Sequence, residues 1–357
     1  MRVSRAESRF QMSTERKYFG TMPDGTNVDC CILAKGQTKV TLIEYGARIA
    51  DINYRGFQTI GGFHTLEGYL KDTEHQGSTI GRYANRIKDG LFTLNGTQYV
   101  LAKNEGGVTH LHGGNVGYDV RVWKLTKIEE TDDVARATFT IVSEDGEEGY
   151  PGKLDISVTF SLTNDNAFTI DYSATTDKDT VISMTNHSYF CISGCGESIL
   201  DQILTIDSDK FVAVDDLLIP TGLADVEGTY FDFRKPKAIG CDIDKFDDIQ
   251  LKRGGGYDHC WVLNHSSKDS PVASLYSPLS KINVDVYTTE DGIQVYAGNR
   301  MDEDNPFYGK FIQKPRYCVC MECCARPDSP NQKDFPSVVL KAGETYTQTT
   351  TYKYSTK

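Results

Sequence analysis

Strict alternation of apolar and polar side chains runs through most of this sequence. In LDISVTFSL, apolar residues occupy every second position from Leu154 to Leu162, with polar residues between them. Successive side chains of a β-strand point to opposite faces, so this pattern predicts a strand with one buried face. The alternation resumes from Phe168 to Tyr172 after a TNDN turn. Helical periodicity is scarce, and HTLEGYLKD at 64–72 is the main segment that favours a short helix.

Turn signals between the alternating segments indicate antiparallel strands. Asn95-Gly96 joins two alternating runs in LFTLNGTQYVL, and this dipeptide tolerates the positive φ angles of a two-residue hairpin turn. The segment 338–354 predicts a strand, a glycine turn and a last strand. No linker, low-complexity run or internal repeat divides the chain. We therefore predict an all-β protein: one large antiparallel β-sandwich with few short helices, in a single domain over residues 18–357.

The first 17 residues, MRVSRAESRFQMSTERK, are polar and lack an apolar signal segment, so we expect a disordered tail and no secretory signal. Ten cysteines without such a signal indicate free thiols in a reducing compartment, and hence the cytosol. The formal charge of −12 disfavours nucleic acid and anionic membranes as partners. A small polyhydroxylated ligand suits this composition better, and the sequence leaves the oligomeric state open between monomer and weak dimer.

Polar residues cluster in five short segments beside strand-like sequence. His110 and His112 stand two positions apart, which would place both on one face of a strand and is compatible with metal ligation. The alternative is that one of them is a structural hydrogen-bonding residue. His187 before the apolar pair Tyr189-Phe190 is open to a structural or a functional interpretation, and Asp258 would also suit a turn cap.

The segment CVCMECCARPDSPNQ from residue 318 combines four cysteines with one glutamate. Its cysteine spacing is compatible with zinc, with disulfides, or with a strand that positions a catalytic carboxylate. Side chains of Cys323 and Cys324 point to opposite faces of a strand, so they cannot both join Cys318 and Cys320 around one ion. We therefore predict four free thiols and no metal. A strand here buries Glu322, and a buried carboxylate requires a partner or a function.

The sequence lacks the motifs of several reaction classes. It contains no serine nucleophile elbow, phosphate-binding loop or dinucleotide fingerprint, so proton transfer on a sugar remains the best chemical interpretation. Over residues 18–355 the chain resembles the aldose 1-epimerase (galactose mutarotase) family. The segments that carry the resemblance are GRYANRIKDGLFTLNGTQY, HLHGG with YDVRVW, DGEEGYPG, TNHSYF, YDHCWVL, TTEDGIQVYAGN and PDSPNQKDFPSVVLKAGETY.

This resemblance implies a β-sandwich with an open cleft and an isomerase that needs no cofactor. Its substrates would be free aldohexoses such as galactose and glucose, whose α and β anomers it would interconvert. The family pattern implies that Glu322 is the general base, His187 the general acid, and His112 an assistant at the reacting oxygens. The residues that would bind sugar hydroxyls are Asn85, Arg86, Asp258 and Gln294. The family usually follows its catalytic glutamate with Thr-Gln, whereas Cys323 and Cys324 stand here.

The implied mechanism begins with Glu322 ionised and His187 protonated. We expect each charge to stabilise the other, which would raise the pKa of the histidine and lower that of the glutamate. The acid limb of a pH profile would then report Glu322 and the alkaline limb His187. The alternatives are a non-catalytic sugar-binding or sensing protein, a sugar-phosphate epimerase on the same fold, and a cupin-like metal enzyme using His110, His112 and His187.

Overall fold

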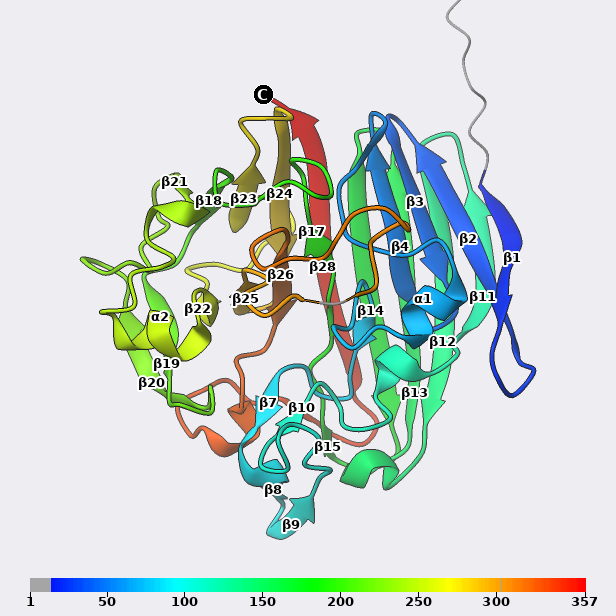
Figure 1. Cartoon of the computed structure of the whole chain (residues 1–357). Helices are drawn as coiled ribbons and strands as arrows, with labels where there is room; N and C mark the ends of the chain where they lie inside the picture. Colours follow the sequence, from blue (N-terminus) through cyan, green and yellow to red (C-terminus); the bar gives the residue numbers. More distant parts are fainter. Residues whose placement is uncertain (1–13, 303) are drawn as a thin grey trace, which may run out of the picture.

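Three antiparallel sheets dominate the computed structural model, which describes residues 14–302 and 304–357 (Figure 1). The five-stranded sheet contains β1 (Glu15–Thr21), β2 (Asn27–Lys35), β3 (Thr38–Ile43), β4 (Arg48–Tyr54) and β5 (Phe57–Gln58). The nine-stranded sheet has the order β11 (Lys124–Glu130), β12 (Val134–Ser143), β13 (Leu154–Thr163), β14 (Ala167–Thr176), β28 (Thr345–Thr356), β24 (Ile282–Thr288), β23 (Ala273–Tyr276), β18 (Ile203–Ile206) and β21 (Lys237–Ala238).

The third sheet provides much of the site. Its order is β17 (Tyr189–Phe190), β26 (Val319–Cys324), β25 (Gly292–Tyr296), β22 (Asp258–Val262), β19 (Lys210–Val214) and β20 (Pro220–Asp225). Four two-stranded pairs complete the β structure: β6 (Thr79–Ile80) with β16 (Thr185–Asn186), β7 (Arg86–Ile87) with β10 (His110–Leu111), β8 (Leu91–Leu94) with β9 (Thr97–Val100), and β15 (Thr180–Val181) with β27 (Val339–Leu340).

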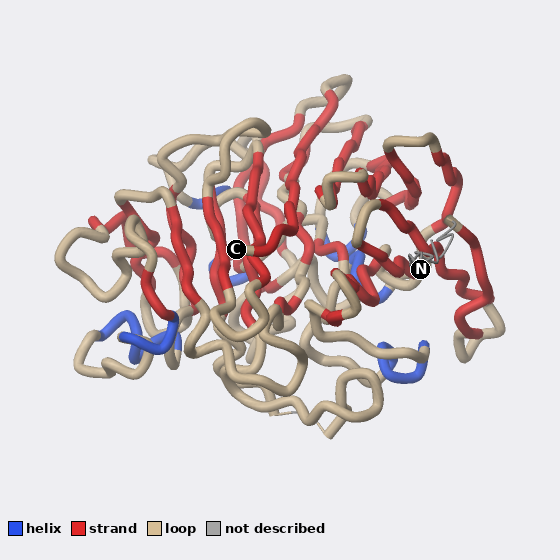
Figure 2. Tube along the Cα trace, turned by 90° about the horizontal axis from the view of Figure 1, so that it is seen from above, coloured by secondary structure: helices blue, strands red, loops and turns tan. Residues whose placement is uncertain are grey.

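Helices are few and short, as the sequence predicted (Figure 2). In the described residues, α1 spans Leu66–Leu70 and α2 spans Ile249–Gly254. The single-turn 3₁₀ segments are η1 (Lys88–Gly90), η2 (Tyr118–Val120), η3 (Glu147–Gly149), η4 (Ile239–Cys241) and η5 (Ser329–Asn331). No helix within residues 14–302 and 304–357 combines the length and apolar content that crossing a bilayer requires.

One large apolar cluster joins the three sheets. Leu33 of β2 and Val158 of β13 belong to it, as do Trp261 of β22 and Tyr352 of β28. Each of these side chains is at most 1% exposed, and burying one such side chain contributes about 1.5–3 kcal/mol. The nine-stranded sheet is thus covered by both smaller sheets, and the prediction of an all-β antiparallel sandwich is confirmed.

The alternation in the sequence corresponds to real strand faces. In β13, the apolar positions from Leu154 to Leu162 are buried, and this strand pairs antiparallel with β14 as the TNDN turn predicted. The Asn95-Gly96 dipeptide connects the hairpin of β8 and β9. These predictions succeeded because a period of two specifies both strand and buried face.

The N-terminal boundary needs a correction. Residues 1–13 of the expected tail lie outside the described residues, but Glu15–Lys17 belong to β1 and pair with Cys30–Ile32 of β2. The prediction of disorder as far as residue 17 is therefore wrong for these three positions. Their side chains are charged and lie on an edge strand, where half-exposed polar residues carry little alternation.

Candidate active site

The two faces of β26 explain the glutamate in its apolar surroundings. Val319, Met321 and Cys323 point into the main apolar cluster, so the alternate position Glu322 points the other way, toward a cavity. The strand is fixed from behind by the nine-stranded sheet. Tyr352 Oη donates to the carbonyl of Met321 at 2.8 Å. The strand that the sequence offered as one of three interpretations is therefore the one observed.

Neighbouring strands bring two further polar side chains beside Glu322. Gln294 of β25 lies directly opposite Glu322 in the strand register, and Asp258 begins the next strand, β22. Gln294 Nε2 donates to Asp258 Oδ1 at 2.8 Å. Gln294 Oε1 is buried and has no hydrogen-bond partner among the described residues, which leaves an acceptor for a ligand hydroxyl.

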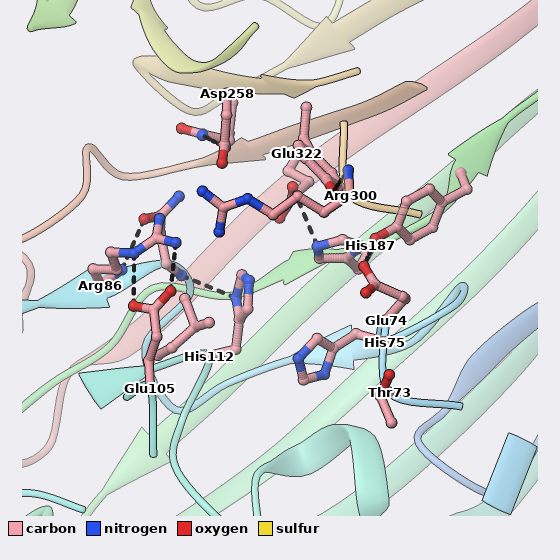
Figure 3. A pocket seen from close by; sticks show the side chains of 15 residues that line it. Thr73, Glu74, His75, Arg86, Glu105, His112, His187, Asp258, Arg300 and Glu322 are labelled. Carbon is pink, nitrogen blue, oxygen red and sulfur yellow. Dashed lines mark hydrogen bonds and ion pairs between the residues drawn. The ribbon is translucent and has the colours of Figure 1, made fainter. Parts of the chain in front are cut away.

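His187 is brought to Glu322 by the pairing of β17 with β26. It lies between β16 and β17, and Tyr189 of β17 is opposite Cys320. His187 Nε2 is 3.5 Å from Glu322 Oε1 (Figure 3). This distance exceeds a strong hydrogen bond, so the two groups face the same space rather than closing on each other.

His112 and Asn85 face the cavity from loops rather than from regular strands. Both have positive φ angles, 51° and 65°, and Asn85 N donates to His112 Nδ1 at 3.1 Å. Because Nδ1 accepts that hydrogen bond, the neutral ring carries its proton on Nε2. Backbone geometry thus fixes His112 as a hydrogen-bond donor.

Arg86 of β7 is held by a carboxylate that the sequence analysis did not select. Its Nε and Nη2 donate to the two oxygens of Glu105 at 2.8 and 2.6 Å. Thr109 Oγ1 also donates to Glu105 at 2.6 Å. A two-point pair of this kind fixes the guanidinium plane, so Arg86 presents a defined edge to the cavity.

All seven residues selected from the sequence line one cavity of about 200 Å³. The sequence analysis missed several others, including Arg300, which extends across the cavity toward Arg86 in Figure 3. His75 shortly precedes the GRYANR segment, and this position could have marked it as a candidate site residue. No sequence pattern distinguished Arg300 from an ordinary loop arginine. The further lining residues are Thr73, Glu74, His75, Glu105, Leu111, Tyr189, Tyr296 and Arg300.

Burial, and not the attraction between Glu322 and His187, determines the direction in which their pKa values shift. Desolvation, followed by the nearby charge of Asp258, raises the pKa of Glu322 well above its usual value, although Arg86 opposes this. Desolvation and then the charge of His75 lower the pKa of His187 to about 3. The expectation that the pair would raise the histidine pKa and lower the glutamate pKa is therefore wrong for the free protein. Each group is almost completely buried, so its charged form loses more hydration than its partner restores.

His110 does not join the other histidines. Its Nδ1 donates to the carbonyl of Ala102 at 2.7 Å, and its Nε2 accepts from Tyr150 Oη at 2.5 Å. The expected shared strand face fails because β10 ends at Leu111 and His112 takes a positive φ angle. The interpretation of one histidine as a structural hydrogen-bonding residue is confirmed for His110. The alternative of a cupin-like metal site therefore lacks one of its three proposed histidines.

Within the described residues, the side chains of His112, His187 and Glu322 place one possible ligand atom each within 4.8 Å of the others. A metal at this point would need the lone pair of His112 Nε2. The Asn85 amide instead favours the tautomer with a proton on that nitrogen. The chemistry of these groups therefore fits proton donation and acceptance better than metal ligation.

The four cysteines around Glu322 are buried free thiols. Desolvation is the main cause that raises the pKa of Cys323, to about 12, so this thiol stays protonated at neutral pH. Cys320 Sγ lies 3.6 Å from His187 Nδ1 and packs behind that ring. Cys323 instead packs in the main apolar cluster.

Comparisons with known proteins agree with this geometry. Residues 29–353 match the family model described as aldose 1-epimerase. The chain is 38% identical over 354 residues to the galactose mutarotase of Bos taurus, with 96% of this chain and 99% of that protein covered. It is 34% identical over 326 residues to the aldose 1-epimerase of Escherichia coli K12, covering 88% and 91%. The crystal structure of galactose 1-epimerase from Lactobacillus acidophilus NCFM superposes with a TM-score of 0.85 at 28% identity, over 96% of this chain and 99% of that one.

Proposed function

This chain belongs to the aldose 1-epimerase family, and on that premise we propose that its cavity opens and recloses the pyranose ring of a free aldohexose, with Glu322 and His187 moving the two protons. The protein is an isomerase that interconverts α and β anomers, and galactose and glucose are its proposed substrates. The observation that best supports this proposal is the 3.5 Å approach of Glu322, a possible base, and His187, a possible acid. The cavity around them is lined by side chains that can bind hydroxyl groups.

Ring opening requires two proton movements. Glu322 takes the proton of the C1 hydroxyl while His187 gives one to the ring oxygen, so the C1–O5 bond breaks and C1 becomes an aldehyde. Rotation about C1–C2 followed by the reverse transfers closes the other anomer. A positioned acid and a positioned base each contribute about 10²- to 10⁴-fold.

The pair holds one transferable proton throughout this cycle. In the free protein we expect that proton on Glu322, because burial raises the pKa of Glu322 and lowers that of His187, which favours two neutral groups. The closed sugar requires it on His187, and hydrogen bonds from the C1 hydroxyl to Glu322 and from His187 to the ring oxygen favour that arrangement. After ring opening the proton is again on Glu322. The pair therefore holds one proton at every stage, and only the residue that carries it changes.

The surrounding groups are suited to orient the sugar. His112 Nε2–H and the Arg86 edge are donors, whereas Gln294 Oε1 and Asp258 are acceptors. Asn85 Oδ1 accepts from the amide of Arg86 at 2.8 Å, which leaves its amide nitrogen as a further donor. This mixture matches hydroxyl groups, each of which both donates and accepts.

We expect a bell-shaped dependence of kcat/KM on pH whose limbs are reversed relative to the sequence-based expectation. Below the pKa of His187, about 3, both groups are protonated and no base remains. Above the raised pKa of Glu322, both are unprotonated and no acid remains. Because kcat/KM reports the free enzyme, His187 sets the acid limb and Glu322 the alkaline limb. Measurement of kcat/KM from acid to alkaline pH checks this, and an acid limb that disappears in Glu322→Gln but persists in His187→Asn would contradict it.

We expect mutarotation to be independent of metal. Dialysis against a chelator should leave kcat unchanged, because His112 presents a protonated nitrogen rather than a lone pair. Elemental analysis and rate measurement on the same dialysed sample provide the check. Stoichiometric zinc whose removal abolishes activity would refute the donor role of His112.

Two-dimensional exchange NMR on equilibrated sugars tests the proposed substrates. Exchange peaks between the α and β anomeric protons of galactose and of glucose should strengthen when the protein is added. Acceleration confined to hexose phosphates would favour the alternative of a sugar-phosphate epimerase, and sugar binding without exchange would favour a sensing protein.

We propose that the protein acts in the cytosol. Its proposed partner is a small aldose, and we expect it to bind neither nucleic acid nor membrane.

A further inference from the structure

His75 lines the cavity but has no part in the proton transfers described above. It lies between α1 and β6, and its side chain is 28% exposed. Its Nδ1 is 2.8 Å from Oδ2 of Asp119 in η2, whose side chain is 7% exposed. A carboxylate on Nδ1 fixes both the orientation and the proton of an imidazole.

Buried contacts fix the loop that carries this histidine. Arg48 Nη1 donates to Asp72 Oδ2 at 2.8 Å and to the carbonyl of Gln76 at 2.9 Å, on either side of His75. Arg48 Nη2 donates to the carbonyl of Asp119 at 3.0 Å. One buried guanidinium therefore holds both the loop and the backbone of Asp119 in place.

The same loop is hydrogen-bonded to His187. Gly77 N donates to the carbonyl of His187 at 2.9 Å, and His187 N donates to the carbonyl of Ser78 at 2.9 Å. Any shift of His187 relative to the loop would break these bonds, so the separation of the two histidines is set by backbone contacts.

Three histidine rings thus form a triangle on one side of the cavity. The ring centroids of His75 and His112 are 5.1 Å apart, those of His75 and His187 are 5.7 Å apart, and those of His112 and His187 are 5.2 Å apart. Figure 3 shows Glu322 on the opposite side of His187 from His75. His187 therefore lies between a carboxyl group and a third imidazole.

The triangle contains one histidine suited to remain charged. Burial lowers the pKa of His75, but the hydrogen bond and charge of Asp119 outweigh it, so the net pKa is raised. The pKa values of His112 and His187 are lowered, in each case first by burial and next by the charge of His75. The titratable or charged groups that surround His75 and His187 are Arg48, Asp72, Glu74, His112, Asp119, Tyr189, Cys320 and Glu322.

We propose that His75, held by Asp119, is a positioning residue for the reaction: its positive charge keeps His187 neutral in the free protein while Glu322 holds the one transferable proton. This inference rests on the proposed function and adds a reason why the pair begins each cycle with a single proton. His75 acts through His187 and need not touch the sugar. It extends the active range toward acid, since the acid limb begins where His187 becomes protonated while Glu322 still holds its proton.

Imidazole NMR titration of the wild-type protein tests the charge distribution without any activity measurement. His75 should titrate above the ordinary histidine pKa of about 6.5, and His112 and His187 below it. Asp119→Asn should lower the midpoint of His75, because the hydrogen bond and charge that oppose burial most strongly are then lost and only the charge of Asp72 still opposes it. A His75 that is neutral at pH 6 in the wild type would overturn the proposal.

The His75→Gln variant tests the coupling to His187. Two like charges whose rings are 5.7 Å apart interact strongly enough that the acid limb of kcat/KM should move to higher pH by about one unit or more. His64→Gln is the matched control, since His64 is exposed and its ring contacts Tyr308. An unchanged acid limb in a folded His75→Gln protein would overturn the proposal. Absence of mutarotation in the wild type would instead refute the proposed function and leave the titration result standing.

Discussion

We expect Glu322→Gln to lower kcat by about 10²- to 10⁴-fold and to leave the fold and sugar binding intact, because the amide preserves volume but cannot take the C1 proton. The substitution adds no buried charge, and Gln294 and Asp258 remain to bind the sugar. Initial rates of mutarotation give kcat, and isothermal titration with galactose gives the affinity. Glu227→Gln, at an exposed position outside the cavity, should match the wild type.

A Glu322→Gln protein that binds galactose normally yet retains more than a tenth of wild-type kcat would remove Glu322 from the mechanism. A Glu322→Gln protein that neither folds nor binds galactose would contradict the expectation that the amide preserves the site. Glu322 Oε1 lies 3.5 Å from His187 Nε2, and glutamine has the same shape as glutamate, so the substitution can keep this approach.

His187→Asn should cost a similar factor in kcat, about 10²- to 10⁴-fold, because asparagine cannot deliver a proton to the ring oxygen. The loop is retained by backbone hydrogen bonds to Gly77 and Ser78, so the fold should persist. Rates and circular dichroism on the same preparation check this. His265→Asn, outside the cavity and paired with Asp207, is the matched control.

The double variant sharpens this test. If Glu322 and His187 act on one proton as a unit, the double variant should lose little more kcat than either single variant. Losses that multiply would show that the two groups act in independent steps, which contradicts the shared-proton scheme.

The sequence was sufficient for the sandwich and for the central residues of the site. Strand alternation in β13 and β14 identified buried faces directly, and a single carboxylate among apolar residues of β26 pointed to Glu322. The segments that supplied His112, His187 and Gln294 were recognised as family motifs, and the fold brings them to one cavity although more than 200 residues separate His112 from Glu322.

Other features depend on contacts between distant residues, which no local pattern contains. His75 gains its role from Asp119, 44 positions away, and Glu105 gains its role from Arg86. The pKa directions were mispredicted because the attraction of the pair was considered without the burial of both groups. The helix α2 was missed although Asp248 caps its first turn and Gly255 ends it with a φ angle of 64°, because six residues are too few for a helical period.

Polarimetry of freshly dissolved α-galactose and α-glucose tests the central claim most directly. The wild-type protein should bring the optical rotation to equilibrium faster than buffer alone in a protein-dependent manner, whereas Glu322→Gln and His187→Asn should return the rate nearly to that of buffer. A wild-type protein that binds these sugars but leaves the rate of mutarotation at the buffer value would contradict the account.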